Sequence, residues 1–333
     1  MRRWELQVGV GVVLVTLLLW RARVWELGNT LRGFDPWVAV LVVLLNVPAI
    51  GILAVRTHFV LKRLGYDASP ISLAPVSALG NVAAVVTPGA AGDVIRAPFL
   101  KSHHAVSYSD SFATIVYERT YSFCILCLST LLVAGWRLGP GALRPVIPVI
   151  GLAVLVAPLL AAAPLASLGR WATRTGTHAP RPLRPLVRGL NLAEGRWVQS
   201  LTSLARDVRL SVLFAALTTL IFACMVGQIW LIAGSLSVNL SAGQAALAMG
   251  GSVAAGIASF LPLGLGVLDW TMAALLENAG ASVGTATAVA ILYRATNSLP
   301  AGVLGVASYA YLVIRLRRTG VETTLDAGVE ATD

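Results

Sequence analysis

Charged side chains occur inside apolar stretches of this chain, where they are costly. Glu118 and Arg119 lie within the stretch Ser107–Trp136, and Arg294 lies twelve residues into the stretch Ser282–Ile314. A charged residue inside a membrane segment is by default a candidate functional residue. Neighbouring positions on a helix diverge by about 100°, so Glu118 and Arg119 cannot simply neutralise each other. Each of them therefore needs a partner elsewhere in the fold or a wet cavity.

Arginine in such a position can bind a phosphate-bearing headgroup, because the planar guanidinium group grips phosphate through two parallel hydrogen bonds. One hypothesis has Arg119 and Arg294 receive an anionic headgroup. The other is structural, with intramembrane ion pairs such as Arg119 with Asp93 and Arg294 with Asp269. A carboxylate at Asp93 or Asp269 can also cap the helix that follows it. Both hypotheses stay open at this point, and they can hold together.

Two of the apolar segments are interrupted by proline and glycine. The first, Ile71–Gly92, ends in TPGAAG, and the second, Ser241–Gly266, ends in LPLGLG. Proline removes a backbone donor and glycine favours turns, so both residues break a helix. Such breaks are tolerated at membrane depth only where the backbone is buried in protein or lines a cavity. The residues predicted to shape the two breaks are Pro88, Gly89, Gly92, Pro262, Gly264 and Gly266.

The two broken segments predict an internal repeat. Pro88 and Gly92 correspond to Pro262 and Gly266, both at an offset of 174 residues. In each case an acidic residue follows the break, and an intramembrane arginine comes later in the next apolar segment. Chance similarity between two membrane sequences rich in glycine and proline is the alternative. The predicted repeat halves are residues 37–136 and 210–314.

Composition indicates an all-α polytopic membrane protein. The chain of 333 residues is 57% hydrophobic and 12% charged, whereas soluble domains carry about 25% charged residues. The net charge of +10 fits basic loops that set membrane topology, and no nucleic-acid-binding motif is present. No metalloprotease, P-loop or nucleophile-elbow motif occurs. We therefore expect a single membrane domain over residues 1–318, with no metal, cofactor, catalytic residue or nucleic-acid partner.

The positive-inside rule selects an arrangement of the segments. If both broken segments enter and leave on one side, eighteen basic residues face the cytoplasm and five face outward. If both broken segments span the membrane fully, ten basic residues face the cytoplasm and thirteen face outward. The favoured cytoplasmic set includes Arg56 and Arg96. We therefore predict six full spans plus two re-entrant hairpins that open from opposite faces, which is an inverted-topology repeat of the kind found in transporters.

The remaining segments are predicted to lie outside the membrane core. Residues 170–209 form a cytoplasmic loop, and its part Leu186–Arg209 mixes apolar residues with arginine as an interfacial helix does. Residues 319–333 form an acidic tail that we expect to be disordered. Both termini are expected in the cytoplasm, and the protein is expected in the cell membrane.

These motifs resemble a known family. The run from Asn81 to Arg96, the pair Glu118-Arg119, the second break with Asp269 and the pair Tyr293-Arg294 are similar to the lysylphosphatidylglycerol synthase transmembrane, or flippase-like, family. The resemblance covers about residues 5–318. Asp93 stands where the family usually has glutamate, and the second break has Leu263 where the family usually has glycine. Because the chain ends shortly after its last span, we expect no aminoacyl-transferring domain.

The resemblance implies a translocase for a lipid or a lipid-linked precursor, with an anionic or polyprenyl-phosphate-linked headgroup received between the hairpins. The expected headgroup contacts are Arg96, Arg119, Arg294, Tyr293 and Asn81. Asp93, Glu118 and Asp269 are expected to hold these contact residues in place or to couple them to transport. The alternatives are an intramembrane glycosyl or phosphoryl transferase and a non-transporting scaffold for a separate lipid-modifying enzyme. An enzyme is the less favoured of these hypotheses.

Overall fold

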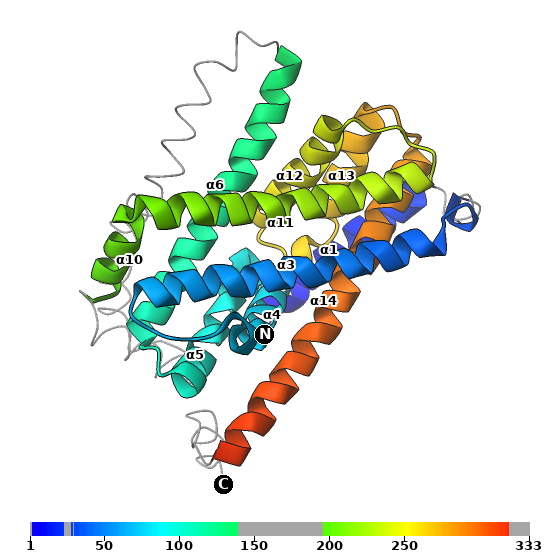
Figure 1. Cartoon of the computed structure of the whole chain (residues 1–333). Coiled ribbons are helices and arrows are strands. Elements are labelled where there is room, and N and C mark those ends of the chain that lie inside the picture. The colour runs from blue at the N-terminus through cyan, green and yellow to red at the C-terminus, as the bar shows by residue number, and fades with distance from the viewer. Residues whose placement is uncertain (1, 23–27, 29, 139–195, 320–333) are drawn as a thin grey trace.

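The described part of the chain is built from helices. The computed structural model describes residues 2–22, 28, 30–138 and 196–319, which contain no β-strand. The long helices α3 (Pro36–Arg63) and α11 (Val208–Ser235) lie side by side across the molecule (Figure 1). The prediction of an all-α fold is therefore confirmed for these residues.

Three helices among the described residues are long and apolar enough to cross a membrane. They are α3, α11 and the part Val283–Leu316 of α14 (Val283–Thr319). At about 1.5 Å per residue, a helix of about 20 residues already matches the ~30 Å hydrocarbon core. The apolar part of α1 (Arg2–Arg21) is shorter. The sequence also has an apolar segment at Val146–Leu168, which we count among the six predicted spans and which lies outside the described residues. The total of six full spans therefore stays a prediction.

Helices α3 and α11 are antiparallel. Arg63 at the end of α3 donates to Asp207 just before α11, at 2.7 Å. Late in α11, Gln228 donates to the carbonyl of Val42 and to Asn46, which both lie early in α3. Each helix therefore ends where the other begins, so the segments that follow them start from opposite ends of the molecule.

The first broken segment leaves one end of the molecule and returns to it. Helix α4 (Pro70–Val86) is followed by the 3-10 helix η1 (Pro88–Ile95), helix α5 (Arg96–His104) and the long helix α6 (Tyr108–Leu138). The Tyr66 hydroxyl, just before α4, donates to Asp110 at the start of α6 at 2.6 Å. The chain therefore enters and leaves this segment at the end where α3 finishes.

The second broken segment repeats this path at the other end. Helix α12 (Ala242–Ala258) leads into the short 3-10 helix η4 (Pro262–Gly264), helix α13 (Val267–Asn278) and α14. Asn46, early in α3, donates to the carbonyl of Thr296, early in α14. Since α11 ends and α14 begins at the end where α3 starts, this segment also enters and leaves at one end. Figure 1 shows α12 and α13 at the opposite end of the pair α3 and α11 from α5.

Side chains before several helices determine where those helices start. Asp35, Ser69, Asp207 and Ser241 each accept a hydrogen bond from a backbone N–H in the first turn of α3, α4, α11 and α12. A capping side chain satisfies one of the N–H groups that a helix start leaves unpaired. The caps therefore fix the register in which the apolar faces of these helices meet.

Helix α10 (Arg196–Arg206) is the described part of the predicted interfacial helix Leu186–Arg209. It ends three residues earlier than predicted, and residues 186–195 lie outside the described residues. Its residues Trp197, Leu201 and Leu204 are buried in a core cluster with Tyr117 of α6 and Phe214 of α11. The apolar face of α10 is therefore covered by protein, because α6 and α11 offer a matching apolar surface.

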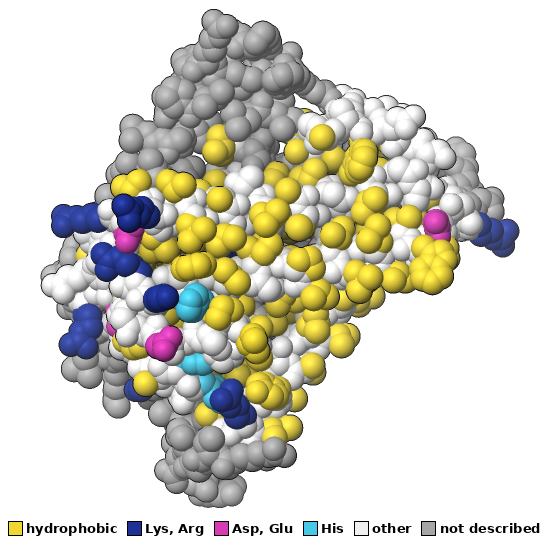
Figure 2. Space-filling model, viewed as in Figure 1, with side chains coloured by type: hydrophobic (Ala, Val, Ile, Leu, Met, Phe, Trp, Pro, Cys, Tyr) yellow, Lys and Arg dark blue, Asp and Glu magenta, His cyan; other side chains and the backbone are white. Residues whose placement is uncertain are grey.

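Exposed basic residues gather at one end of the described structure. They lie at the ends of α3, α5 and α14 and along α10 and the start of α11, and they are Lys62, Arg63, Lys101, Arg196, Arg206, Arg209 and Arg315. Figure 2 shows this concentration of lysine and arginine at the left of the view, beside a broad apolar surface. The opposite end carries the exposed residues Arg21 and Arg32.

Two arginines counted as cytoplasmic from sequence are buried. Arg56 lies within α3 and Arg96 starts α5, and each is 3% exposed. Both were assigned to loops because each follows an apolar run, but α3 continues to Arg63 and α5 turns back into the protein. Without these two, sixteen of the eighteen basic residues that were predicted to face the cytoplasm remain. They still outnumber the five that were predicted to face outward.

Replacing Asp207 by alanine is expected to lower the free energy of unfolding by about 1 kcal/mol. Its carboxylate accepts from the Leu210 N–H at 3.1 Å and from Arg63 at 2.7 Å. The Leu210 amide, with Arg63 adding to it, lowers the pKa of Asp207. The folded pKa thus lies below the unfolded value of about 3.9.

This contribution is present above the unfolded pKa and is lost as the pH falls through the folded value. Thermal unfolding of the detergent-solubilised protein should show a difference between wild type and Asp207→Ala at pH 7 that shrinks near pH 3. A difference that did not change with pH would contradict this account.

Candidate functional site

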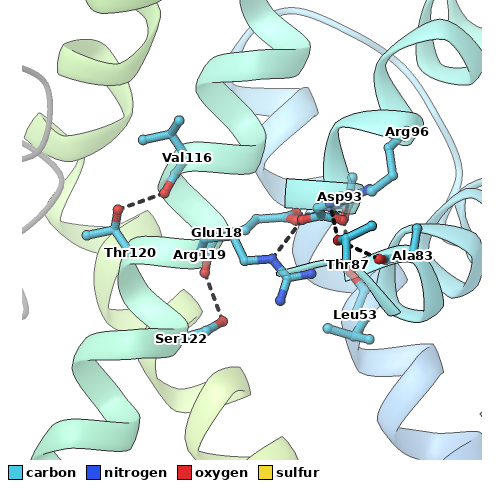
Figure 3. A network of polar contacts seen from close by, with 12 residues as sticks. Leu53, Ala83, Thr87, Asp93, Arg96, Val116, Glu118, Arg119, Thr120 and Ser122 are labelled. Carbon is cyan, nitrogen blue, oxygen red and sulfur yellow. Dashed lines mark hydrogen bonds and ion pairs between the residues drawn. The ribbon is translucent and has the colours of Figure 1, made fainter. Parts of the chain in front are cut away.

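Arg119 and Asp93 form an ion pair between α6 and η1. The Arg119 Nε atom donates to Asp93 at 2.8 Å, and the Arg119 side chain is still 40% exposed. Both of its terminal nitrogens lack a hydrogen-bond partner among the described residues. Figure 3 shows the Nε atom facing Asp93 while the terminal nitrogens point away from it. Arg119 is therefore anchored on one edge and open on the other, where an anion can bind bidentately.

Glu118, the neighbour of Arg119, points to a different set of partners. One carboxylate oxygen accepts from Arg96 at 2.5 Å, and the other accepts from the Thr57 hydroxyl at 2.6 Å. Arg96 also donates to the Thr57 hydroxyl at 2.8 Å and lies 3.6 Å from Asp93. The expectation that Glu118 and Arg119 need separate partners is thus met by residues from α3, α5 and η1. Asp93 does not cap α5, whose first turn has no side-chain cap.

Arg56 joins this cluster without a carboxylate partner. Its Nη2 atom donates to the Ser122 hydroxyl at 3.1 Å and to the Glu118 carbonyl at 3.4 Å. Its guanidinium group lies 4.1 Å from the centre of the Phe214 ring, a distance at which a cation is attracted to an aromatic face. This role was not predicted from the sequence, although Arg56 directly follows the apolar run Trp37–Val55 and one helix can continue through both.

The second half contains a matching but simpler ion pair. Arg294 of α14 donates from Nε to Asp269 of α13 at 2.7 Å. The other Asp269 oxygen accepts from the Gly266 N–H at 3.1 Å, which caps the start of α13. Asp269 therefore combines the ion pair and the cap that were alternatives in the sequence. In both halves, an acid after the break binds the Nε atom of an arginine from the following long helix.

Arg119 lines two cavities that lie among α3, α4, α6, α11, α12 and α14. The larger, of about 410 Å³, is lined by residues that include Arg56, Asn81, Arg119, Asn46, Gln228 and Asn297. The smaller, of about 260 Å³, is lined by residues that include Thr87, Arg119, Tyr293, Arg294 and Asn297. Arg119 and Asn297 line both cavities, so the two spaces share part of their walls. The structure thus brings Arg119 and Arg294, which are 175 residues apart, to a common cavity.

Side-chain amides connect the long helices beside these cavities. Asn297 of α14 donates to Gln228 of α11 at 2.9 Å, and Gln228 donates to Asn46 of α3 at 3.4 Å. Asn46 in turn donates to the Thr296 carbonyl at 3.2 Å. Sequence analysis did not single out Asn46, Gln228 or Asn297, since an isolated amide in an apolar helix carries no partner information. We call this chain of side chains the amide ladder.

At Gly92, Gly264 and Gly266 in the two breaks, neighbouring parts of the protein come too close to the backbone for a larger side chain. The Gly92 N–H donates to the Thr87 hydroxyl at 2.5 Å, and a Cβ atom there would collide with the backbone of Ala83 in α4. Gly264 and Gly266 have φ of 57° and 78°, which L side chains rarely adopt. A Cβ atom at Gly266 would also collide with Leu14 of α1. The breaks predicted from sequence are therefore present, with Pro88 and Pro262 starting the two 3-10 helices and Gly89 within the first.

Replacing Gly92 by alanine is expected to destabilise the fold by about 1–3 kcal/mol, the cost of forcing atoms into a packed core. The matched control is Gly51→Ala in α3, where nothing lies within 4 Å of a new Cβ atom. Alanine is favoured over glycine in a helix by about 0.5–1 kcal/mol, so this control should be neutral or stabilising. Thermal unfolding in detergent measures both, and equal midpoints for the two variants would refute the close approach at Gly92.

The predicted site residues fall into two groups. Arg119, Arg294, Tyr293 and Asn81 line the two cavities. Arg96 lines neither of them and is held by Glu118 and Thr57 instead. Among the described residues, no group of three histidine, cysteine or acidic side chains lies close enough to hold a metal ion.

The apolar helices and the buried charges together define a polytopic membrane protein. The chain belongs to the family described as lysylphosphatidylglycerol synthase TM region, whose model matches residues 4–305 of the 333. This membership indicates a role related to membrane lipids. Comparisons with curated proteins and with solved structures gave no match.

Proposed function

We propose that this protein moves a lipid, or a lipid-linked precursor, between the two leaflets of the membrane and receives its anionic headgroup between the two broken segments. The observation that carries the proposal is the cavity of about 260 Å³ that Arg119 and Arg294 line together. One arginine comes from each half of the chain. Two guanidinium groups that line one cavity are both positively charged, so a phosphate bound between them would be favourable for both.

The paths of the two broken segments support this proposal. Each is a helix, a break and a second helix, and the two start from opposite ends of the antiparallel pair α3 and α11. We interpret them as re-entrant hairpins related by an inverted-topology repeat. In transporters of this kind, broken segments meet near the bilayer midplane, and the two halves give access from opposite faces in turn.

The charge distribution supports an orientation. The end that carries Lys62, Arg63, Lys101 and the arginines of α10 faces the cytoplasm under the positive-inside rule. The first hairpin then opens from the cytoplasm and the second from outside. Both termini lie in the cytoplasm in this arrangement, and the membrane is the cell membrane.

The alternatives fit the site less well. A lipid-linked transferase needs a nucleophile or a metal-binding carboxylate pair, whereas Asp93 and Asp269 are each bound to an arginine of their own half. A scaffold for a lipid-modifying enzyme needs no polar cavity, yet three arginines line the two cavities. Transport is therefore the hypothesis that the site supports best.

Reconstitution tests the proposal. Purified protein in vesicles should speed the exchange of a fluorescently labelled anionic phospholipid between leaflets, measured as accessibility of the label to a membrane-impermeant quencher. The double variant Arg119→Gln, Arg294→Gln should reduce this exchange to the level of protein-free vesicles. Exchange that is absent in the wild type, or unchanged in a folded double variant, would overturn the proposal.

A further inference from the structure

A small polar space lies against the first broken segment. Its volume is about 30 Å³, and its lining includes Arg56 of α3, Ser77 and Asn81 of α4, Asp93 of η1 and Glu118 of α6. It shares Arg56 and Asn81 with the cavity of about 410 Å³. A water molecule occupies about 30 Å³ in the liquid, so this space suits one water molecule or one monatomic ion. A phosphate group, with four oxygens around its phosphorus, is too large for it.

Several polar atoms of the residues that line this space are buried and have no hydrogen-bond partner among the described residues. They are the Nε atoms of Arg56 and Arg96, the Ser77 hydroxyl and one Asp93 oxygen. The first three can each donate a hydrogen bond. The Asp93 oxygen lies 3.6 Å from the Arg96 Nη1 atom, so its charge is already offset. Since a buried donor without an acceptor is costly, the space favours a ligand that accepts.

The charges around the small polar space do not cancel. Its lining brings three guanidinium groups, from Arg56, Arg96 and Arg119, against the two carboxylates of Asp93 and Glu118. Glu118 is bound by Arg96, and Asp93 is bound by Arg119. Among the described residues, Arg56 has no carboxylate oxygen within 4.0 Å. A guanidinium group stays protonated in proteins, so one positive charge is left over.

The contacts that Arg56 makes offset only part of its charge. Its Nη2 atom donates to the Ser122 hydroxyl and to the Glu118 carbonyl, and the Phe214 ring lies 4.1 Å from the guanidinium group. An aromatic ring attracts a cation more weakly than burial of an unpaired ion costs. A water molecule would satisfy the donors without balancing the charge, and a metal cation would be repelled by the surplus. A small anion does both.

We infer that the small polar space between α3, α4, η1 and α6 binds one chloride ion. Arg56 balances its charge, and the Nε atoms of Arg56 and Arg96 and the Ser77 hydroxyl donate to it. The ion thereby joins α3 to the first broken segment and stabilises their packing. This inference goes beyond the proposed function, because it concerns an inorganic ion in a space that is too small for a lipid headgroup.

Chloride binding to the purified protein in an uncharged detergent tests the inference. Equilibrium dialysis against radioactive chloride is expected to give one bound ion per chain. The midpoint of thermal unfolding should rise as chloride replaces gluconate at constant ionic strength, and the rise should level off as the site fills. Bromide should act like chloride, whereas inorganic phosphate should act like gluconate.

Two outcomes of these measurements would overturn the inference. The first is a protein that binds no chloride in dialysis. The second is a midpoint that phosphate raises and chloride does not, because Arg56 would then serve the phosphate of a headgroup.

Ser77→Asp is the decisive variant, since it places a carboxylate beside Arg56 on the wall of the small polar space. This tethered charge should take the place of the ion, so the variant should bind no chloride and unfold at the same temperature in chloride and in gluconate. Ser77→Ala removes one donor and keeps the surplus charge, and it should weaken chloride binding at least tenfold.

Arg56→Gln removes the surplus charge and should abolish both the bound ion and the effect of chloride on unfolding. The matched control is Arg21→Gln, which removes an arginine of the ion pair with Glu277 and should keep both. Wild-type chloride binding in folded Ser77→Asp and Arg56→Gln would place the ion elsewhere and refute the site.

The inference and the proposed function fail separately. If chloride binds at this site and reconstituted protein moves no lipid, the inference stands and the proposed function fails. If lipid moves and no chloride binds, the proposed function stands and the inference fails.

Discussion

Replacing Arg96 by methionine is expected to lower the free energy of unfolding by about 3–5 kcal/mol, the cost of breaking a buried ion pair on one side. Arg96 is 3% exposed and binds Glu118 and Thr57 while lying 3.6 Å from Asp93. Without it, Glu118 keeps a buried charge with no cation in contact. The measurement is the midpoint of thermal unfolding in detergent, followed by size-exclusion chromatography.

Two controls separate the loss of the ion pair from the loss of packing. The double variant Arg96→Met, Glu118→Met removes both charges and should recover most of the stability, because apolar replacement of a whole buried pair is often neutral. Arg21→Gln breaks the partly exposed pair with Glu277, which is worth about 0–1 kcal/mol. If Arg96→Met unfolded no earlier than Arg21→Gln, the central role of Arg96 would be wrong.

Replacing Arg119 by glutamine is expected to weaken binding of an anionic lipid tenfold or more. A hydrogen bond to a charged group contributes about 1.5–3 kcal/mol, and about 1.4 kcal/mol corresponds to tenfold in affinity. Arg119 lines both cavities. Only its Nε atom binds Asp93, and its terminal nitrogens point away from that carboxylate (Figure 3). Lipid competition in detergent measures the effect.

Asp93→Asn is the decisive comparison, because it weakens the same ion pair from the other side. Asparagine can still accept from the Arg119 Nε atom, but it no longer offsets the positive charge of Arg119 and Arg96. Binding of an anionic lipid should therefore be kept or tightened in Asp93→Asn. If the pair is purely structural, both variants should lose stability and neither should change lipid affinity.

Sequence patterns located the two breaks and the charged residues because these depend on local chemistry. Proline and glycine interrupt a helix wherever they occur, so Pro88 to Gly92 and Pro262 to Gly266 were identifiable without a fold. The ion pairs of Arg119 with Asp93 and of Arg294 with Asp269 were also named as possibilities. The choice between an ion pair and a helix cap at each acid needed the structure, because it depends on the angle at which the next helix leaves the break.

The residues that sequence analysis missed all act across helices. Arg56 was counted with cytoplasmic bases because its position follows an apolar run, yet α6 and α11 enclose it. The amide ladder joins α3, α11 and α14 across 69 and 182 positions of sequence. No local pattern predicts such partners, since each amide is one polar residue in an otherwise ordinary apolar helix.

The sequence by itself determined that this protein lies in a membrane, that its charges inside the apolar segments are few, and that two breaks recur in its halves. These features follow from hydrophobicity and backbone chemistry, which act residue by residue. Only the tertiary structure decided that Arg119 and Arg294 share a cavity, that Arg56 stands there without a carboxylate, and that Arg96 is held by Glu118 instead. Those outcomes depend on how antiparallel helices pack, because packing sets which distant side chains meet and which are left facing open space.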